Sequence, residues 1–250
     1  MWEAAFWGLV GGSALVVGAG IGYAARLPQR LIAAVMAVGS GVLISAVAFD
    51  LMDEAYERGG FGATAAGFVG GALAYTLANI ALSRRGAKHR KRSGSNPEES
   101  QPEAGTDTGL ALAVGALLDG VPESVVIGTS LLGGAGVSAV TVAAVFLSNV
   151  PEGLSSAAGM RKAGRGPGYI FGVWGGIALA SGVAAMLGYA ALAGASPATV
   201  AGVTAVAAGA ILAMLVDTMI PEATEATHEY SGLIAVLGFL VAFWLSKLEG

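Results

Sequence analysis

The chain has 250 residues, of which 55% are hydrophobic and only 12% are charged, and its mean hydropathy is +0.71. Soluble domains carry charge on about a quarter of their residues, so this composition excludes an ordinary soluble protein and predicts an integral membrane protein. The chain contains no cysteine, which excludes disulfide bonds and thiolate metal sites.

Apolar stretches long enough to cross a bilayer recur along the whole chain. A helix needs about 20 mostly apolar residues to cross the hydrocarbon layer. By this measure we expect an all-α membrane protein with eight transmembrane helices, in a single domain formed by residues 1–250. The expected spans are approximately 4–25, 31–54, 61–83, 108–132, 136–160, 168–193, 198–221 and 231–247.

Residues 84–107 form the one long polar segment, and their charged, Pro- and Ser-rich composition predicts a disordered loop. Eight alternating spans place this loop on the same side of the membrane as RLPQR and RKAGRG. These segments together hold eleven of the thirteen basic residues. By the positive-inside rule that side is cytoplasmic, which puts both termini outside the cytoplasm.

The basic residues of this loop have two interpretations. We interpret them chiefly as determinants of topology, and specific binding of anionic lipid or nucleic acid is the alternative. The topology interpretation predicts the lipid bilayer as a partner and no nucleic acid. It assigns no chemistry to the loop.

Acidic side chains lie well inside the fourth and fifth expected spans. Each carboxylate at the centre of a membrane helix costs about 2.5–3.5 kcal/mol, so Asp119, Glu123 and Glu152 need a compensating partner. Asp119 and Glu123 are four residues apart and therefore share one helix face. Ser148 repeats that spacing with Glu152, and Asn149 stands three residues before Glu152. If the two faces meet, they form a site with oxygen ligands only.

A proline stands directly before each of two of these glutamates, in LLDGVPESVVIG and FLSNVPEGLSSA. Pro122 cannot donate a hydrogen bond to the carbonyl of Leu118, nor Pro151 to that of Leu147, and freed carbonyls can coordinate cations. No basic residue falls in the core of any expected span. We therefore favour cation coordination on a transport route. Protonated carboxyls acting as a proton relay or as helix-joining groups are one alternative, and activation of water by an intramembrane protease is another.

Two further acidic groups lie near helix ends. Asp50, Asp53 and Glu54 end the second expected span, and Asp217 and Glu222 end the seventh. Charge at the level of the lipid headgroups is an ordinary explanation for the second-span group. Asp50 and Asp217, however, each lie deeper than their neighbours. We interpret the two groups as the outer entrance and the cytoplasmic exit of a metal route.

The two Pro-Glu motifs resemble those of the ZIP (Zrt/Irt-like) family of divalent metal transporters, particularly its bacterial branch. The family's fourth helix carries HNxPEG and its fifth (H/Q)(N/D/E)xPEG, to which DGVPES and SNVPEG are similar. The number of spans, the long loop after the third span and the acidic helix ends are also similar. The resemblance implies inverted repeats of helices 1–3 and 6–8 around helices 4–5. It also implies a carrier in the plasma (inner) membrane rather than an enzyme.

Carried over residue by residue, the resemblance assigns the metal ligands. Asp119 takes the family's histidine position in the fourth helix, and Glu123 takes its glutamate position. The polar positions of the fifth-helix motif fall on Ser148, Asn149 and Glu152. The resemblance therefore implies that these residues hold the metal.

The chain departs from the family pattern at Gly120 and Ala184, where relatives have a metal-binding asparagine and often a glutamate. These departures predict that one of two metal positions is lost or weakened. The family implies zinc as the substrate, whereas ligation by oxygen alone also favours manganese, magnesium or calcium, and carboxylates bind iron(II) as well.

The main hypothesis is a carrier that brings a divalent cation into the cytoplasm. A metal-binding membrane sensor or scaffold without flux is the first alternative, and an intramembrane hydrolase, for which no nucleophile motif is present, is the second. Glycine-lined stretches such as GVWGGIALASG leave a homodimer open, although packing within the bundle also explains them.

Overall fold

The computed structural model describes residues 1–94, 101, 109–133, 137–225 and 229–249. Within these ranges the chain is helical with short connections and contains no strand, which confirms the all-α prediction for this part of the chain. The α-helices are α1 (Trp2–Ala24), α2 (Gln29–Ala46), α3 (Met52–Leu82), α4 (Gly109–Ser130), α5 (Ala139–Lys162), α6 (Pro167–Leu192), α7 (Pro197–Met214), α8 (Ile220–Glu225) and α9 (Ser231–Glu249). The short segments between them are the π-helical η1 (Val47–Leu51), η2 (Ser83–Ala87) and η4 (Leu215–Met219) and the 3-10 segment η3 (Leu131–Gly133).

Among the described residues, six helices are long and apolar enough to cross a membrane, as expected for a multi-pass membrane protein. The longest of them runs for 59 residues through α2, η1, α3 and η2. At Gly60 its backbone leaves the helical region, with φ 69° and ψ 173°, and the chain reverses direction there. The second and third expected spans lie on the two sides of this turn. The fifth expected span coincides with α5, which is not among the six because its second half carries many polar residues.

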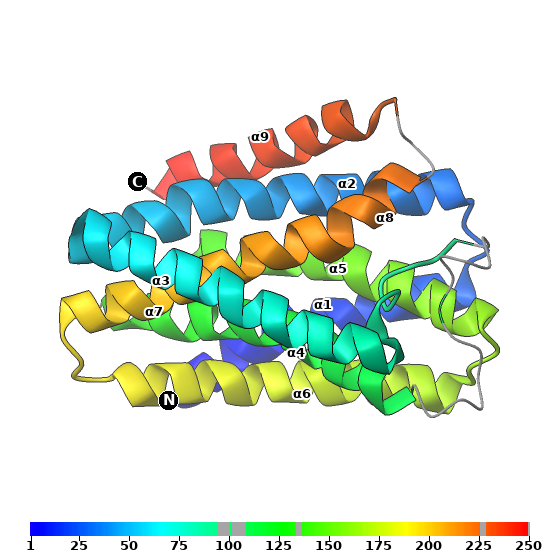
Figure 1. Ribbon diagram of the computed structural model, residues 1–250, viewed down its shortest axis with the longest axis horizontal. Helices are drawn as coiled ribbons and strands as arrows, with labels where there is room; N and C mark the ends of the chain where they lie inside the picture. The colour runs from blue at the N-terminus through cyan, green and yellow to red at the C-terminus, as the bar shows by residue number, and fades with distance from the viewer. Residues whose placement is uncertain (95–100, 102–108, 134–136, 226–228, 250) are drawn as a thin grey trace.

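The helices lie roughly along the long axis of the molecule, and both chain termini lie at the same end of it (Figure 1). The helices that bear the Pro-Glu motifs lie between the others. α4 packs against α6, α7 and α1, and α5 packs against α1 and α2. Nearly every side chain of α5 from Ser148 to Met160 is buried. The acidic residues of the two motifs therefore face protein rather than lipid.

Glycine allows the close approach of α1 and α5. A Cβ atom at Gly153 of α5 would collide with the carbonyl oxygen of Leu15, and one at Gly18 of α1 would collide with that of Val150. Small residues let membrane helices come together in this way, because van der Waals packing replaces the hydrophobic effect there. The glycine-rich sequence thus gives the tight packing that holds the α5 motif in place.

The segment after α3 differs from the predicted disordered loop over residues 84–94. η2 continues the helix to Ala87, and a turn then carries Arg90 and Lys91 into the protein, where both are buried. Gln101 is also buried. Composition predicted disorder because a charged segment cannot form a core of its own, but it did not consider charged partners elsewhere in the bundle. Residues 95–100 and 102–107 of the predicted loop lie outside the described residues.

Candidate functional site

The three central acidic residues lie in the interior of the bundle. Asp119 and Glu123 come from α4 and Glu152 from α5, and their exposed fractions are 0%, 1% and 3%. Ser148 and Asn149 of α5 are buried as well. Buried carboxylates are stable only when they are paired, hydrogen-bonded or protonated, so the contacts of each one show what the site does with its charge.

Arg90 forms a two-pronged ion pair with Asp119. Its Nε lies 2.8 Å from Oδ2 and its Nη2 2.7 Å from Oδ1. The Tyr75 hydroxyl donates to Oδ1 of the same carboxylate at 2.7 Å and accepts from Arg90 Nη2 at 2.8 Å. Two parallel charge-assisted bonds are the strongest arrangement that arginine makes with a carboxylate. Asp119 is therefore neutralised by the protein itself.

The ionisation of Arg90 is secure in this setting. Burial alone would lower the pKa of its guanidinium, but the neighbouring Asp119 carboxylate and its hydrogen bonds outweigh that effect and raise the pKa above its ordinary value. Arg90 Nη1 also donates to Asn79 Oδ1 at 2.9 Å and to the Ala87 carbonyl at 3.2 Å. The guanidinium is thus charged and held by partners on every side.

Lys91 bridges the two motif helices. Its Nζ lies 2.8 Å from Oε2 of Glu152 and 3.3 Å from Oδ2 of Asp119. The ammonium therefore stands between a carboxylate of α4 and a carboxylate of α5. A cation that joined these helices through the same oxygens would need this position.

The absence of basic residues from the span cores favoured a cation as the partner of the central carboxylates, but basic side chains from outside the spans reach two of them. The helices themselves supply none, but Arg90 and Lys91 enter from the segment after η2. Long basic side chains can carry a charge several ångströms from their own backbone, which a count of charges within spans does not register. Tyr75 and Asn79 were also missed. Their spacing of four residues on one face of the third expected span was a signal that this face meets polar groups.

Glu123 differs from the other two carboxylates. Among the described residues, neither of its carboxylate oxygens has a hydrogen-bond partner, although both are buried. Its electrostatic neighbours are Glu152, Lys91 and Asp119. Oδ1 of Asn149 likewise has no hydrogen-bond partner among the described residues, while its Nδ2 donates to the Gly11 carbonyl at 3.0 Å. Burying such oxygens is costly unless they gain a proton or a cation, so they mark the part of the site that is open to a ligand.

Ser148, the remaining predicted ligand, bonds within its own helix. Its Oγ donates to the Val145 carbonyl at 2.9 Å. Its hydroxyl oxygen keeps lone pairs, because a hydroxyl both donates and accepts. The structure thus leaves Ser148 able to act as an acceptor without assigning it a partner in that role.

The predicted exit residues are connected to the centre by the same basic segment. Glu222 of α8 is fully buried. Its Oε1 accepts from the Ser93 amide at 3.0 Å and from the Ser93 hydroxyl, and it lies 2.9 Å from Ser155 Oγ. Asp217 is exposed and accepts from Asn79 Nδ2 at 3.2 Å. Asn79 therefore connects Asp217 with Arg90, and the two acidic groups form one network.

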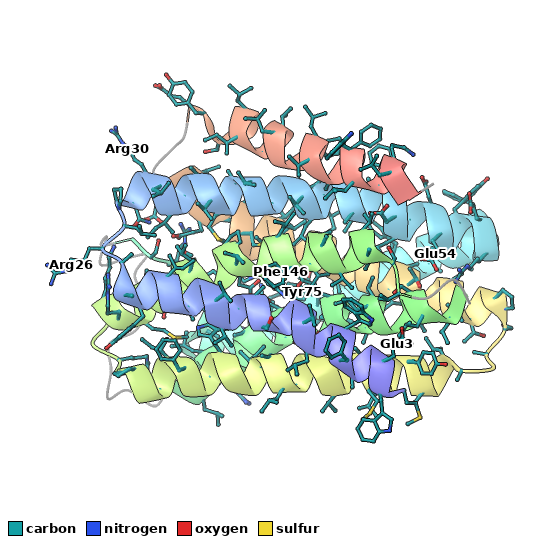
Figure 2. The ribbon with its side chains drawn as sticks, turned by 180° about the vertical axis from the view of Figure 1, so that it is seen from behind. Glu3, Arg26, Arg30, Glu54, Tyr75 and Phe146 are labelled. Carbon is teal, nitrogen blue, oxygen red and sulfur yellow. The ribbon has the colours of Figure 1, made fainter. Side chains whose placement is uncertain are left out.

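The predicted entrance residues lie apart from this network. Figure 2 shows Glu54 at one end of the bundle and Arg26 and Arg30 at the other. Glu54 pairs with Arg58 at 2.7 Å, Asp50 accepts from Ser246 Oγ at 2.6 Å, and Asp53 is exposed. The cavity beside Asp50 has a volume of only about 10 Å³ and a mainly apolar lining. It is too narrow to carry a hydrated ion to the centre in this conformation.

The predicted ligands lie near one another in the bundle, but they do not form a complete metal-coordination site. In the part of the chain that the structure describes, no group of three or more His, Cys, Asp or Glu side chains is arranged to hold a metal ion. Basic side chains form ion pairs with two of the predicted ligands, Asp119 and Glu152. A cation would need these two carboxylates to exchange partners.

No protein-family model matches the chain, and no curated protein matches it. The resemblance to the ZIP family therefore rests on the motifs and their placement.

Proposed function

We propose that the protein is a multi-pass membrane carrier for a divalent cation, zinc or a similar ion such as manganese or iron, and that it is not an enzyme. The observation that carries the proposal is Glu123. It is a fully buried carboxylate without a partner among the described residues, beside two further carboxylates on adjacent proline-containing helices. Ionisable residues inside membrane segments are costly and generally mark ion or proton pathways.

Two matching helix interruptions support an inverted-repeat architecture. α2 and α7 each have 18 residues, and each runs directly into a five-residue π-helical segment, η1 or η4. Each of these segments contains one aspartate, Asp50 in the first and Asp217 in the second. π-helical turns inside α-helices occur frequently at functional sites. The predicted outer entrance and cytoplasmic exit would then be equivalent positions of two related halves.

The packing of the helices supports the same architecture. α3 packs on α7 as α9 packs on α2, and α1 packs on α5 as α6 packs on α4. These pairs are consistent with an exchange of α1, α2 and α3 with α6, α7 and α9, with α4 and α5 exchanging at the centre. In carriers built from inverted repeats, the substrate lies near the middle of the membrane between the repeats. Asp119, Glu123 and Glu152 lie on the two central helices.

The number of crossings and the orientation follow from this proposal. With the turn at Gly60 counted as a reversal and α5 counted as a span, the chain crosses the membrane eight times. The basic connections then lie at one end, with both termini at the other, in agreement with Figure 1. By the positive-inside rule the basic end faces the cytoplasm of a cell whose plasma membrane holds the protein.

A route for the cation follows from the positions of the acidic residues. The outer group would attract the ion: Asp50, Asp53 and Glu54. The central group would hold it, first through the open oxygens of Glu123 and Asn149 and then through the carboxylates shared by α4 and α5. The inner group, Glu222 and Asp217, would receive it. Because the cavity beside Asp50 is narrow and mainly apolar, passage of the ion requires the helices that line this cavity to move apart.

One observation favours a second candidate function. Asp119 is fully satisfied by Arg90 and Tyr75, as it would be in a static scaffold. A metal-binding sensor or scaffold of the same architecture would keep this pairing permanently. It would bind a cation without moving it.

Uptake into proteoliposomes tests both candidates. We expect the purified chain to admit zinc, manganese or iron(II) in a competition panel, and Glu123→Gln combined with Glu152→Gln to lower uptake at least about tenfold, since even outer partners of metal ligands contribute that much to affinity. The matched control is Glu3→Gln, which removes an exposed carboxylate at the terminus and leaves uptake unchanged. Undiminished uptake by the double variant would refute the route through the central carboxylates, and no uptake by the wild-type chain would refute the carrier. Tight binding by calorimetry without any uptake would favour the sensor.

A further inference from the structure

Four consecutive residues of the predicted loop each hold a different acidic residue of the bundle. Arg90 pairs with Asp119 and Lys91 with Glu152. The list is completed by Arg92 with Glu225 at 2.9 Å and by Ser93 with Glu222. We refer to residues 90–93 as the RKRS segment. The segment reaches both the central and the inner acidic groups of the proposed route.

The backbone of the RKRS segment is docked by side chains of α5. The Arg90 carbonyl accepts from Ser156 Oγ at 2.7 Å, and the Lys91 carbonyl accepts from Ser155 Oγ at 2.7 Å. Gln101 Nε2 also donates to the Arg90 carbonyl, at 2.9 Å. The segment is therefore held by its main chain as well as by its charges. A stretch of basic residues held only by electrostatic attraction would not need these backbone hydrogen bonds.

Two glycines provide the space in which the segment lies. A Cβ atom at Gly115 of α4 would stand 2.7 Å from Arg90 Cδ, and one at Gly159 of α5 would collide with the Arg92 carbonyl oxygen. Both motif helices thus lack a side chain at the point where the RKRS segment passes. Together with the serine hydroxyls of α5, these glycines form a built seat for the segment.

The ammonium of Lys91 and a bound metal ion cannot occupy the site together. A divalent ion lies about 2.0–2.2 Å from carboxylate oxygens, so one that joined Asp119 and Glu152 would overlap the position of Nζ. Nζ is 2.8 Å from the Glu152 oxygen and 3.3 Å from the Asp119 oxygen. Repulsion between the two positive charges adds to the overlap.

We propose that the RKRS segment is a built-in cationic occupant of the carboxylate site, and that Lys91 competes directly with the transported cation for the position between Asp119 and Glu152. The inference rests on the proposed carrier function. The segment neutralises the carboxylates of the empty protein and must leave its seat before the cation can bind between Asp119 and Glu152. Lys91 and Arg90 thereby set the apparent affinity of the site.

The charge of the site in the two states is consistent with an exchange. In the docked state Arg90 and Lys91 supply two positive charges to Asp119 and Glu152. A divalent cation supplies the same charge in a smaller volume. Glu123, without a partner in the described chain, gives an arriving cation a first ligand before the segment has left. Burying an ion pair costs desolvation energy that offsets much of its attraction, so the docked state can be displaced.

Calorimetry on the purified full-length chain tests the competition, with zinc and manganese as separate probes. If the seat is filled in about 99 of 100 empty molecules, Lys91→Gln should lower the apparent Kd for the metal by up to about a hundredfold, because apparent affinity scales with the fraction of molecules that are competent to bind. The matched control is Lys88→Gln, which removes an exposed positive charge two residues before the RKRS segment and should leave Kd unchanged.

A second variant frees the segment without changing any charge. Gly159→Ala places a methyl group against the Arg92 carbonyl oxygen and should lower Kd in the same direction as Lys91→Gln. Limited trypsin digestion gives an independent measurement, since the metal should speed cleavage within residues 88–93 of the wild-type chain. Unchanged Kd values in both variants, or cleavage that metal does not affect, would overturn the inference while leaving the carrier intact. Absence of both binding and uptake in the wild-type chain would instead overturn the carrier.

Discussion

Replacement of Arg90 by glutamine tests whether the buried ion pair with Asp119 holds the structure together. The change removes the two short bonds to Asp119, 2.8 Å and 2.7 Å, and leaves a fully buried carboxylate behind. Breaking a buried pair by removing one partner costs about 3–5 kcal/mol. Asp119 keeps the Tyr75 hydroxyl at 2.7 Å and Lys91 at 3.3 Å, which limits the loss. We therefore expect about 2–3 kcal/mol of destabilisation.

Thermal unfolding of the detergent-purified chain measures this loss. For a chain of this size each kcal/mol corresponds to roughly 2–4 °C, so the midpoint should fall by about 5–10 °C. Arg84→Gln is the matched control, because it removes an exposed guanidinium of η2 and should change the free energy of unfolding by less than about 0.5 kcal/mol. Equal midpoints for the two variants would refute the buried pair.

The pH dependence of this difference has a definite sign. A group whose pKa is raised in the folded protein contributes stability that is present below its unfolded pKa and is lost only as the pH rises through the folded value. The pKa of Arg90 is raised from an ordinary value that already lies far above neutrality. The difference in unfolding midpoint between wild type and Arg90→Gln should therefore be the same at about pH 7 and about pH 9. A difference that shrank over this interval would contradict the assignment.

Three further substitutions have expected outcomes from the structure. Tyr75→Phe removes the hydroxyl that joins Asp119 to Arg90 and should lower stability by about 1–2 kcal/mol in the same unfolding assay, whereas a neutral result would mean that the hydroxyl is not in the network. Gly153→Ala forces a methyl group against the carbonyl of α1 and should cost at least about 3 kcal/mol or abolish folding, while Gly175→Ala, with open space around it, should fold normally by size-exclusion chromatography. Arg58→Gln breaks a half-exposed pair and should cost no more than about 1 kcal/mol, and a larger loss would indicate a further role.

The all-α architecture and the burial of the central acidic residues could be predicted from the sequence. Long apolar runs predict membrane helices because each residue contributes to hydropathy independently of its neighbours in space. The expected first and last spans, 4–25 and 231–247, agree closely with α1 and α9. The burial of the predicted site residues on α4 and α5 also follows from the motif, since a lipid-facing carboxylate would be too costly.

The partners of these acidic residues did not follow from the sequence. Whether Arg90 and Lys91 stay in water or enter the bundle depends on carboxylates that lie 29 and 61 residues away from them, respectively, along the chain. Composition describes the average tendency of a segment and does not register such a specific pairing. The π-helical segments at Asp50 and Asp217 were not predicted from the sequence either.

The covalent link between the RKRS segment and the bundle fixes how strongly it can compete. A competitor on the same chain has an effective concentration set by geometry, in the millimolar range for short flexible connections, and neither dilution nor dialysis changes it. Every copy of the protein therefore presents one ammonium group to each site at the same local concentration. An ion that binds no better than a tethered lysine would have to reach comparable concentrations to enter. The docked segment would thus exclude abundant cations that bind the carboxylates only weakly.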